Sequence, residues 1–99
     1  MRLISQDGRV DLPYEQVGVT IDAADKKTII ACPVNVADET YWNMAKYSTK
    51  KRASMAMKLL TYTYTRRKYV EDYFQLPSDN EIEEKYNMFL KKNIICFFK

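Results

Sequence analysis

The chain has 99 residues and a formal net charge of +3, and 46% of its residues are hydrophobic. This length fits one domain spanning residues 1–99, and the apolar content excludes a disordered or low-complexity chain. No apolar run approaches the roughly 20 residues that span a bilayer, and the first residues lack the apolar stretch of a signal peptide. We therefore expect a cytoplasmic protein that makes no contact with a membrane.

Residue types that many enzymes need are missing. The sequence has no histidine, which excludes Ser-His-Asp and Cys-His catalysis and most zinc sites. Glycine occurs only at Gly8 and Gly18, so a glycine-rich phosphate-binding loop is excluded as well. The two cysteines, Cys32 and Cys96, are interpreted as small buried apolar residues. We expect no enzyme, no cofactor and no metal site, although lysine, tyrosine and carboxylate groups leave catalysis open as an alternative.

The first 34 residues have the pattern of three or four antiparallel strands. Residues 2–5 and 10–12 flank Asp7-Gly8, a dipeptide typical of hairpin turns because glycine accepts a positive φ at little cost. Pro13 cannot donate to a strand ladder, so the second strand should end there or lie at a sheet edge.

Two further strands follow in this meander. Residues 16–22 alternate between apolar and polar side chains, and 28–34 form a β-branched run that predicts a more buried strand. The polar residues 24–27 between them predict a turn. Residues 35–40 predict a polar loop, and the aromatic segment 41–47 predicts one more strand.

A helix is predicted over residues 49–66. Ser48-Thr49 offers an N-cap, and apolar residues then recur at the spacing of a helix face that packs on a sheet. This stripe consists of Ala53, Ala56, Met57, Leu60 and Tyr64. Met55, Leu59 and Tyr62 lie off the stripe, so the helix is apolar on more than one side.

A second helix is predicted near the end of the chain. Residues 69–76 fit either an extension of the first helix or a strand, and proline follows them to end either one. Ser78-Asp79-Asn80-Glu81 has the capping-box pattern, with the serine accepting an amide hydrogen bond and the glutamate reaching back. Apolar residues at helical spacing follow, which predicts a helix over 79–92 that ends at Asn93.

The apolar run 94–98 must be buried, either as a last strand or at an interface. Together these elements predict an α+β fold with an antiparallel sheet of about four to five strands. The main helix (49–66) packs on one face of this sheet, and the second helix (79–92) is C-terminal.

Charge is distributed unevenly along the chain. Residues 1–39 carry four basic and seven acidic side chains, residues 40–70 carry eight basic and no acidic ones, and residues 71–99 carry four basic and six acidic ones. The basic residues of the central segment are Lys46, Lys50, Lys51, Arg52, Lys58, Arg66, Arg67 and Lys68. Three of them fall in the first turn of the predicted helix, where cations oppose the helix dipole, so the positive charge is expected to serve binding.

These eight cations are the candidate binding residues, and two interpretations of them stay open. In one, they form a contact surface for nucleic acid or an acidic protein, with the aromatic residues between them as a stacking platform. In the other, Asp and Glu of other elements balance their charge, and the aromatic residues belong to the core. Arg66-Arg67-Lys68 then simply complements the C-terminal end of the helix dipole.

Two stretches of the sequence resemble a known group of proteins. The run Met1-Arg2-Leu3-Ile4-Ser5-Gln6-Asp7-Gly8, followed by Asp11-Leu12-Pro13-Tyr14-Glu15, resembles the N-terminal "ISQDG…D.PYE" hairpin of small uncharacterised proteins from Firmicutes phages and integrated elements. Residues 45–82 are similar to the same group more loosely. The chain departs from it at Lys50-Lys51-Arg52, where the group is usually acidic.

The resemblance implies a phage or mobile-element protein in the cytoplasm of a bacterial host cell. Small phage proteins without catalytic residues often bind a host protein, and many inhibit defence systems such as CRISPR nucleases. We expect a non-enzymatic, anti-CRISPR-like inhibitor whose partner is a host protein or ribonucleoprotein complex. The alternative is a small nucleic-acid-binding module that uses the basic segment 46–68.

Overall fold

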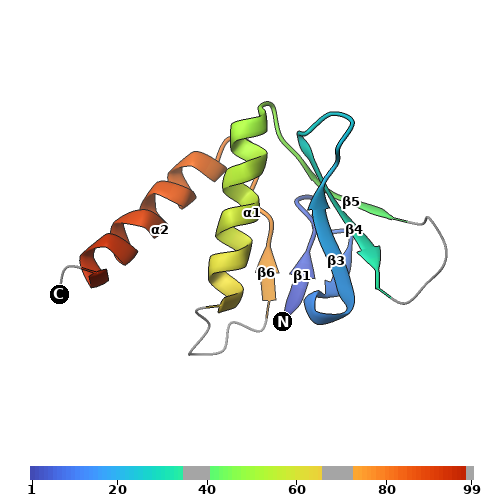
Figure 1. Cartoon of the computed structure of the whole chain (residues 1–99), viewed down its shortest axis with the longest axis horizontal. Coiled ribbons are helices and arrows are strands. Elements are labelled where there is room, and N and C mark those ends of the chain that lie inside the picture. The colour runs from blue at the N-terminus through green and yellow to red at the C-terminus, as the bar shows by residue number, and fades with distance from the viewer. Residues whose placement is uncertain (35–40, 66–72, 98–99) are drawn as a thin grey trace.

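The structure, a computed structural model, describes residues 1–34, 41–65 and 73–97, and the side chains of the last range as far as Lys91. The described residues form six strands in two small sheets, and two helices (Figure 1). The elements are β1 (Arg2–Ile4), β2 (Asp11–Pro13), β3 (Val17–Ile21), β4 (Thr28–Pro33), β5 (Trp42–Lys46), α1 (Lys50–Thr65), β6 (Tyr73–Gln75) and α2 (Ile82–Phe97). Neither described helix is long and apolar enough to cross a bilayer.

The first sheet has the order β2-β1-β6, with β1 antiparallel to β2 and parallel to β6. Its hairpin turns at Gly8, whose φ of 78° lies in the region that glycine adopts at little cost, so the predicted turn is confirmed. The Asp7 carboxylate closes the turn by accepting hydrogen bonds from the Ser5 hydroxyl at 2.6 Å and the Arg9 amide at 3.0 Å. The segment 69–76, open between helix and strand in the sequence, supplies β6 in its described part.

The second sheet contains β3, β4 and β5 in antiparallel order. The α+β class is therefore confirmed, but the prediction of one antiparallel sheet of about four to five strands is wrong. The physical cause lies in the single 3-10 turn of Tyr14–Gln16, which follows the end of β2 at Pro13. The Tyr14 N–H still donates to the Met1 carbonyl at 2.9 Å, and the turn then redirects the chain so that Val17 begins a strand of a different sheet.

Strand β5 confirms the predicted strand 41–47 and contains a β-bulge at Met44, where its pairing with β4 shifts register. The side chains of Met44 and Ala45 are both buried instead of alternating between the two faces. The predicted loop 35–40 lies outside the described residues.

Helix α1 follows the predicted helix 49–66 closely. It begins after Thr49, whose hydroxyl accepts a hydrogen bond from the Arg52 amide at 3.1 Å and so provides the predicted N-cap. In the predicted stripe, Ala53, Ala56 and Leu60 are buried, and Met57 and Tyr64 are half-buried. Leu59, which lies off the stripe, is also buried. Helix α1 is contacted by α2 as well as by the strands.

Helix α2 continues as far as Phe97, so the predicted end at Asn93 is wrong, and so is the strand alternative for 94–97, whereas its interface alternative stays a prediction. An asparagine inside a helix costs only a fraction of a kcal/mol, unlike a proline, and the residues after it do not break helices. The capping box also differs from its prediction. The Ser78 hydroxyl donates to the Glu81 carboxylate at 3.0 Å, and the amides of Glu81 and Ile82 donate to the Ser78 carbonyl.

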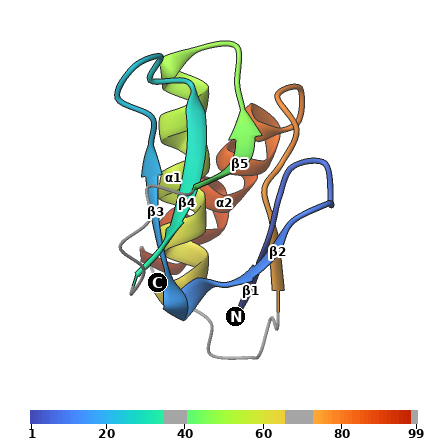
Figure 2. The same ribbon diagram turned by 90° about the vertical axis from the view of Figure 1, so that its right-hand side faces the viewer.

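One contiguous core joins both sheets and helix α1. Helix α1 packs against β3 and β4, and Figure 2 shows it behind that sheet. The fully buried side chains come from every layer, and they include Leu3, Ile29, Met44, Leu60 and Ile82. Helix α2 packs against α1 and then runs away from the sheets (Figure 1).

The residues Leu76–Asp79, here called the junction segment, connect these elements. The Leu76 N–H donates to the Ile4 carbonyl of β1 at 3.0 Å. The Pro77 carbonyl accepts hydrogen bonds from the Tyr47 hydroxyl at 2.7 Å and from the Gln6 side-chain amide at 3.0 Å. Burial raises the pKa of the Tyr47 hydroxyl, so this group stays protonated and keeps its role as a donor.

Candidate protein-binding face

The described basic residues of the central segment lie on two elements, β5 and α1. Lys46 ends β5, the residues Lys50–Arg52 form the first turn of α1, and Lys58 lies in the middle of that helix. The remaining candidates Arg66, Arg67 and Lys68 lie outside the described residues.

Arg52 is engaged inside the protein. Its guanidinium contacts an Asp79 carboxylate oxygen at 2.9 Å, a Glu83 carboxylate oxygen at 3.4 Å and the Ser48 hydroxyl at 3.1 Å. The Ser48 N–H donates to the other Asp79 oxygen at 2.8 Å. Arg52 therefore connects the start of α1 to the start of α2, and acidic residues of another element balance its charge.

The same contacts change the acidity of Asp79. The hydrogen bond from the Ser48 N–H, together with the neighbouring Arg52 charge, holds the pKa of the Asp79 carboxyl below its ordinary value of 3.8. The carboxylate is thus ionised near neutral pH, so the connection between the two helices is charged there.

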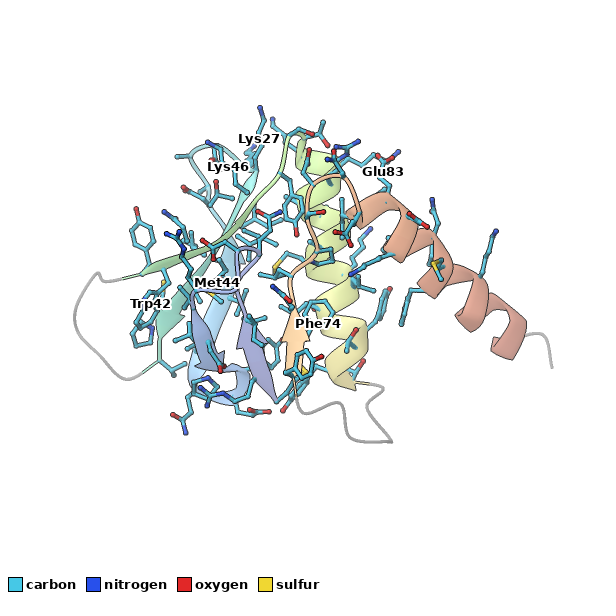
Figure 3. The ribbon with its side chains drawn as sticks, turned by 180° about the vertical axis from the view of Figure 1, so that it is seen from behind. Lys27, Trp42, Met44, Lys46, Phe74 and Glu83 are labelled. Atoms are coloured by element: carbon cyan, nitrogen blue, oxygen red, sulfur yellow. The ribbon has the colours of Figure 1, made fainter. Side chains whose placement is uncertain are left out.

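Lys46 borders an acidic hollow of about 410 Å³. The charged residues lining this hollow are Asp7, Asp22, Asp25 and Lys46. A hydrogen bond from the Thr28 hydroxyl lowers the pKa of Asp25, and the Lys46 charge adds to the effect. Figure 3 shows Lys27 and Lys46 close together at this end of the molecule. Ionised carboxylates offset these lysines, which weakens the attraction of this end for phosphate groups.

Lys50, Lys51 and Lys58 are the exposed cations of α1, and they form no ion pair with another described residue. The first turn of the helix contains no acidic residue. Among the described candidates, these three lysines are therefore the ones most open to a partner.

Lys58 also borders a hollow of about 210 Å³ on α1. The residues that line it are Met57, Lys58, Thr61 and Tyr62. Lys58 and Tyr62 lie four residues apart on the side of the helix away from Ala56 and Leu60, and Met57 lies at the edge of the buried stripe. The hollow therefore extends from the edge of the buried stripe to the exposed side of α1.

Helix α2 adds an aromatic ring to this side of α1. The rings of Tyr62 and Phe89 stack with their centroids 5.5 Å apart and an angle of 11° between their planes. Tyr62 remains 38% exposed, and Met88, next to Phe89 in the sequence, is 58% exposed. We call the surface formed by Met57, Lys58, Thr61, Tyr62 and Phe89 the helical face.

The sequence indicates only part of the helical face. Lys58 belongs to the candidate cations, and Tyr62 lies off the predicted core stripe. Met57 belongs to that stripe, and Met57 and Phe89 are both partly buried and pack against the core. The apolar residues on a second side of α1 are the signal that points to this face, but they do not identify α2 as the neighbour.

Within the described ranges, no group of three or more His, Cys, Asp or Glu side chains is placed to hold a metal ion. No protein-family model, no curated protein and no solved structure matches the chain. The likeness of the N-terminal hairpin to phage proteins therefore stays a prediction.

The charge of Asp79 should make the connection between the helices sensitive to acid. Because the folded pKa lies below the unfolded one, the carboxylate contributes its full stability above its ordinary value of 3.8 and loses it as the pH falls through that value toward the folded pKa. The Asp79→Asn variant should thus be less stable than the wild type near pH 7, and the difference should shrink near pH 3. Urea unfolding followed by circular dichroism at both pH values measures this difference.

A matched control is Glu84→Gln, at an exposed residue of α2 that forms no ion pair with another described residue. This variant should differ less from the wild type at neutral pH than Asp79→Asn does. Equal stability losses in the two variants, or an Asp79→Asn loss that does not change with pH, would contradict the role of the Asp79 charge.

Proposed function

We propose that this protein is a non-enzymatic binding protein that covers a surface of a partner protein with its helical face. The observation that supports this most is the combination of an apolar hollow, an aromatic stack and an exposed lysine on one side of α1. In line with the N-terminal resemblance, the proposal includes a phage or mobile-element origin. The partner is then a host protein or ribonucleoprotein complex, such as a CRISPR nuclease, whose activity the binding inhibits.

The size of the hollow favours a protein partner over a small ligand. Its volume of about 210 Å³ is below the ~300–1,000 Å³ of most small-molecule sites. A hollow of this size accommodates one apolar side chain of a partner. Lys58 at its edge then favours an acidic residue beside that side chain.

The residue types of the helical face are those of protein interfaces. Tyrosine and methionine are enriched at interfaces, and tyrosine provides a large contact area at a low cost in side-chain entropy. The stack on Phe89 already restricts the ring of Tyr62, and the Arg52–Asp79 contact fixes the start of α2 relative to α1. Binding therefore requires little ordering of the protein.

The proposal is tested by capture of partners from a host lysate, with and without nuclease treatment, followed by affinity measurements on the purified partner. If Tyr62 is a central contact, Tyr62→Ala should weaken the affinity about 30-fold, which is typical of an interface hot spot. The matched control is Tyr73→Ala on β6, because Tyr73 is also exposed, at 59%, and lies outside the helical face.

Two outcomes would contradict the proposal. One is equal affinity of the Tyr62→Ala and Tyr73→Ala variants for the captured partner. The other is the absence of any specific partner together with no protection of a phage against defended hosts in a plaque assay.

The second candidate function is nucleic-acid binding through the basic segment 46–68. It is favoured by Lys50 and Lys51, which are exposed in an acid-free helical turn. Arg52 contributes less to such a site, because Asp79 and Glu83 already contact its guanidinium.

For this candidate, binding to DNA or RNA should weaken steeply with salt, and the Lys50→Ala/Lys51→Ala variant should lower the slope of log K against log[salt] by about one to two. Fluorescence anisotropy with a labelled oligonucleotide measures both effects. The control is Arg9→Ala/Lys91→Ala, which removes the same charge from exposed residues elsewhere. Binding that is absent at low salt, or that both variants weaken equally, would reject nucleic-acid binding through this segment.

A further inference from the structure

The edges of the two sheets differ in how well they are protected against pairing with another chain. The four edge strands are β2, β6, β3 and β5. β2 and β6 span only three residues each, and β2 ends in proline. β5 is covered by Gln6, whose backbone N–H donates to the Met44 carbonyl at 2.8 Å and whose side-chain oxygen accepts from the Lys46 N–H at 3.2 Å.

Strand β3 lacks each of these protections. It is five residues long, pairs with β4 in an unbroken register, and contains no proline and no charged residue. Natural edge strands usually carry a charge, a proline or a bulge to prevent pairing with another chain. Figure 2 shows β3 as the outermost strand of its sheet.

The register of β3 on β4 determines which backbone groups point outward. The Asp22 N–H donates to the Thr28 carbonyl at 2.8 Å, so the even-numbered residues of β3 bond to β4 and the odd-numbered ones face away. The outward-facing residues are Val17, Val19 and Ile21.

Two of the six outward groups already have partners. The Val17 N–H donates to the Tyr14 carbonyl, and the Ile21 carbonyl accepts from the Thr20 hydroxyl at 3.4 Å. The Val17 carbonyl, both groups of Val19 and the Ile21 N–H make no hydrogen bond with another described residue. Two donors and two acceptors thus remain for a strand that approaches this edge.

We propose that a second copy of this chain pairs with β3, so that two β3 strands form an antiparallel ladder about a two-fold axis at Val19. In this register, Val19 exchanges two hydrogen bonds with the partner's Val19, and each Ile21 N–H donates to the partner's Val17 carbonyl. The two groups that already have partners, the Val17 N–H and the Ile21 carbonyl, face each other across the ladder. Every free donor therefore meets a free acceptor, which makes the edge complementary to itself.

Gly18 provides an independent reason for this pairing. A Cβ built at Gly18 would have the Cys32 carbonyl oxygen as its nearest neighbour, at 4.0 Å, so packing within the chain does not require glycine there. In the proposed ladder, Gly18 lies opposite the partner's Thr20 in a non-hydrogen-bonded pair, where the Cα atoms approach to about 4.5 Å. A glycine inside a strand often marks such a close approach of another backbone.

The pairing joins the β3-β4-β5 sheet of one copy to the same sheet of the second copy, which gives one sheet of six strands. Because α1 packs against β3 and β4, both copies of α1 lie on the same face of that sheet. The helical face points away from the sheets on each copy, so the dimer leaves it free. The dimer and the proposed partner binding can therefore be tested separately.

The test uses charge at Thr20, an exposed residue of β3. The two Thr20 side chains are diagonal neighbours in the ladder, about 7–8 Å apart, so like charges at this position repel and opposite charges attract. Sedimentation equilibrium from about 10 µM to about 1 mM should show a reversible dimer of the wild-type chain, since a short ladder gives a weak interface. Thr20→Lys and Thr20→Glu should each weaken it at least about tenfold, and mixing the two variants should restore it.

Control variants Asn87→Lys and Asn87→Glu make the same charge changes at an exposed residue of α2 and should dimerise like the wild type. In NMR spectra, the amides of Val19 and Ile21 should shift with protein concentration more than those of Gly18 and Thr20. A wild-type chain that stays monomeric to about 1 mM, or a mixture no stronger than either Thr20 variant alone, would overturn the proposal.

Discussion

Hydrogen bonds that converge on the Pro77 carbonyl and the Asp79 carboxylate hold the two sheets and the two helices in one arrangement. Pro77 accepts from Tyr47 at the end of β5 and from Gln6 in the hairpin of the first sheet. Asp79 accepts from Ser48 and Arg52 at the start of α1. Because four elements depend on a few buried or half-buried acceptors, the loss of one bond weakens several contacts at once.

This junction also positions the helical face, the surface proposed to bind a partner. Helix α2 packs mainly against α1, so its direction depends on how its first turn is anchored. Arg52 provides that anchor through Asp79 and Glu83. The stacked rings of Tyr62 and Phe89 then keep the two helices together further along. Arg52, a candidate binding residue in the sequence, thus supports the helical face in the structure.

Local signals in the sequence predicted the elements better than their arrangement. The Asp7-Gly8 turn, the cap at Thr49 and the buried residues Ala53, Ala56 and Leu60 follow from backbone and periodicity rules that act within a few residues. The split into two sheets depends on the turn after Pro13, and the parallel pairing of β1 with β6 joins residues far apart in the chain. Such pairings depend on tertiary packing, which local patterns do not encode.

The candidate site shows the same limit. Eight basic residues lie close together in the sequence, and the described ones are divided between the end of β5, with Lys46, and helix α1, with Arg52 and Lys58. The acidic residues that pair with Arg52 lie 27 and 31 positions further along the chain. Their contact could not be derived from charge spacing within the segment. The helical face likewise depends on α2. The position of α2 relative to α1 cannot be derived from the spacing of apolar residues in either helix.

The central claim is that the junction segment makes the sheets and both helices one cooperative unit. Native-state amide hydrogen exchange tests this most directly, because the amides of Ser48 and Leu76 report on the junction and the amide of Leu60 reports on the core. The expected result is that all three amides exchange through the same global unfolding. Exchange of Ser48 and Leu76 through a smaller opening, with Leu60 still protected, would contradict the claim.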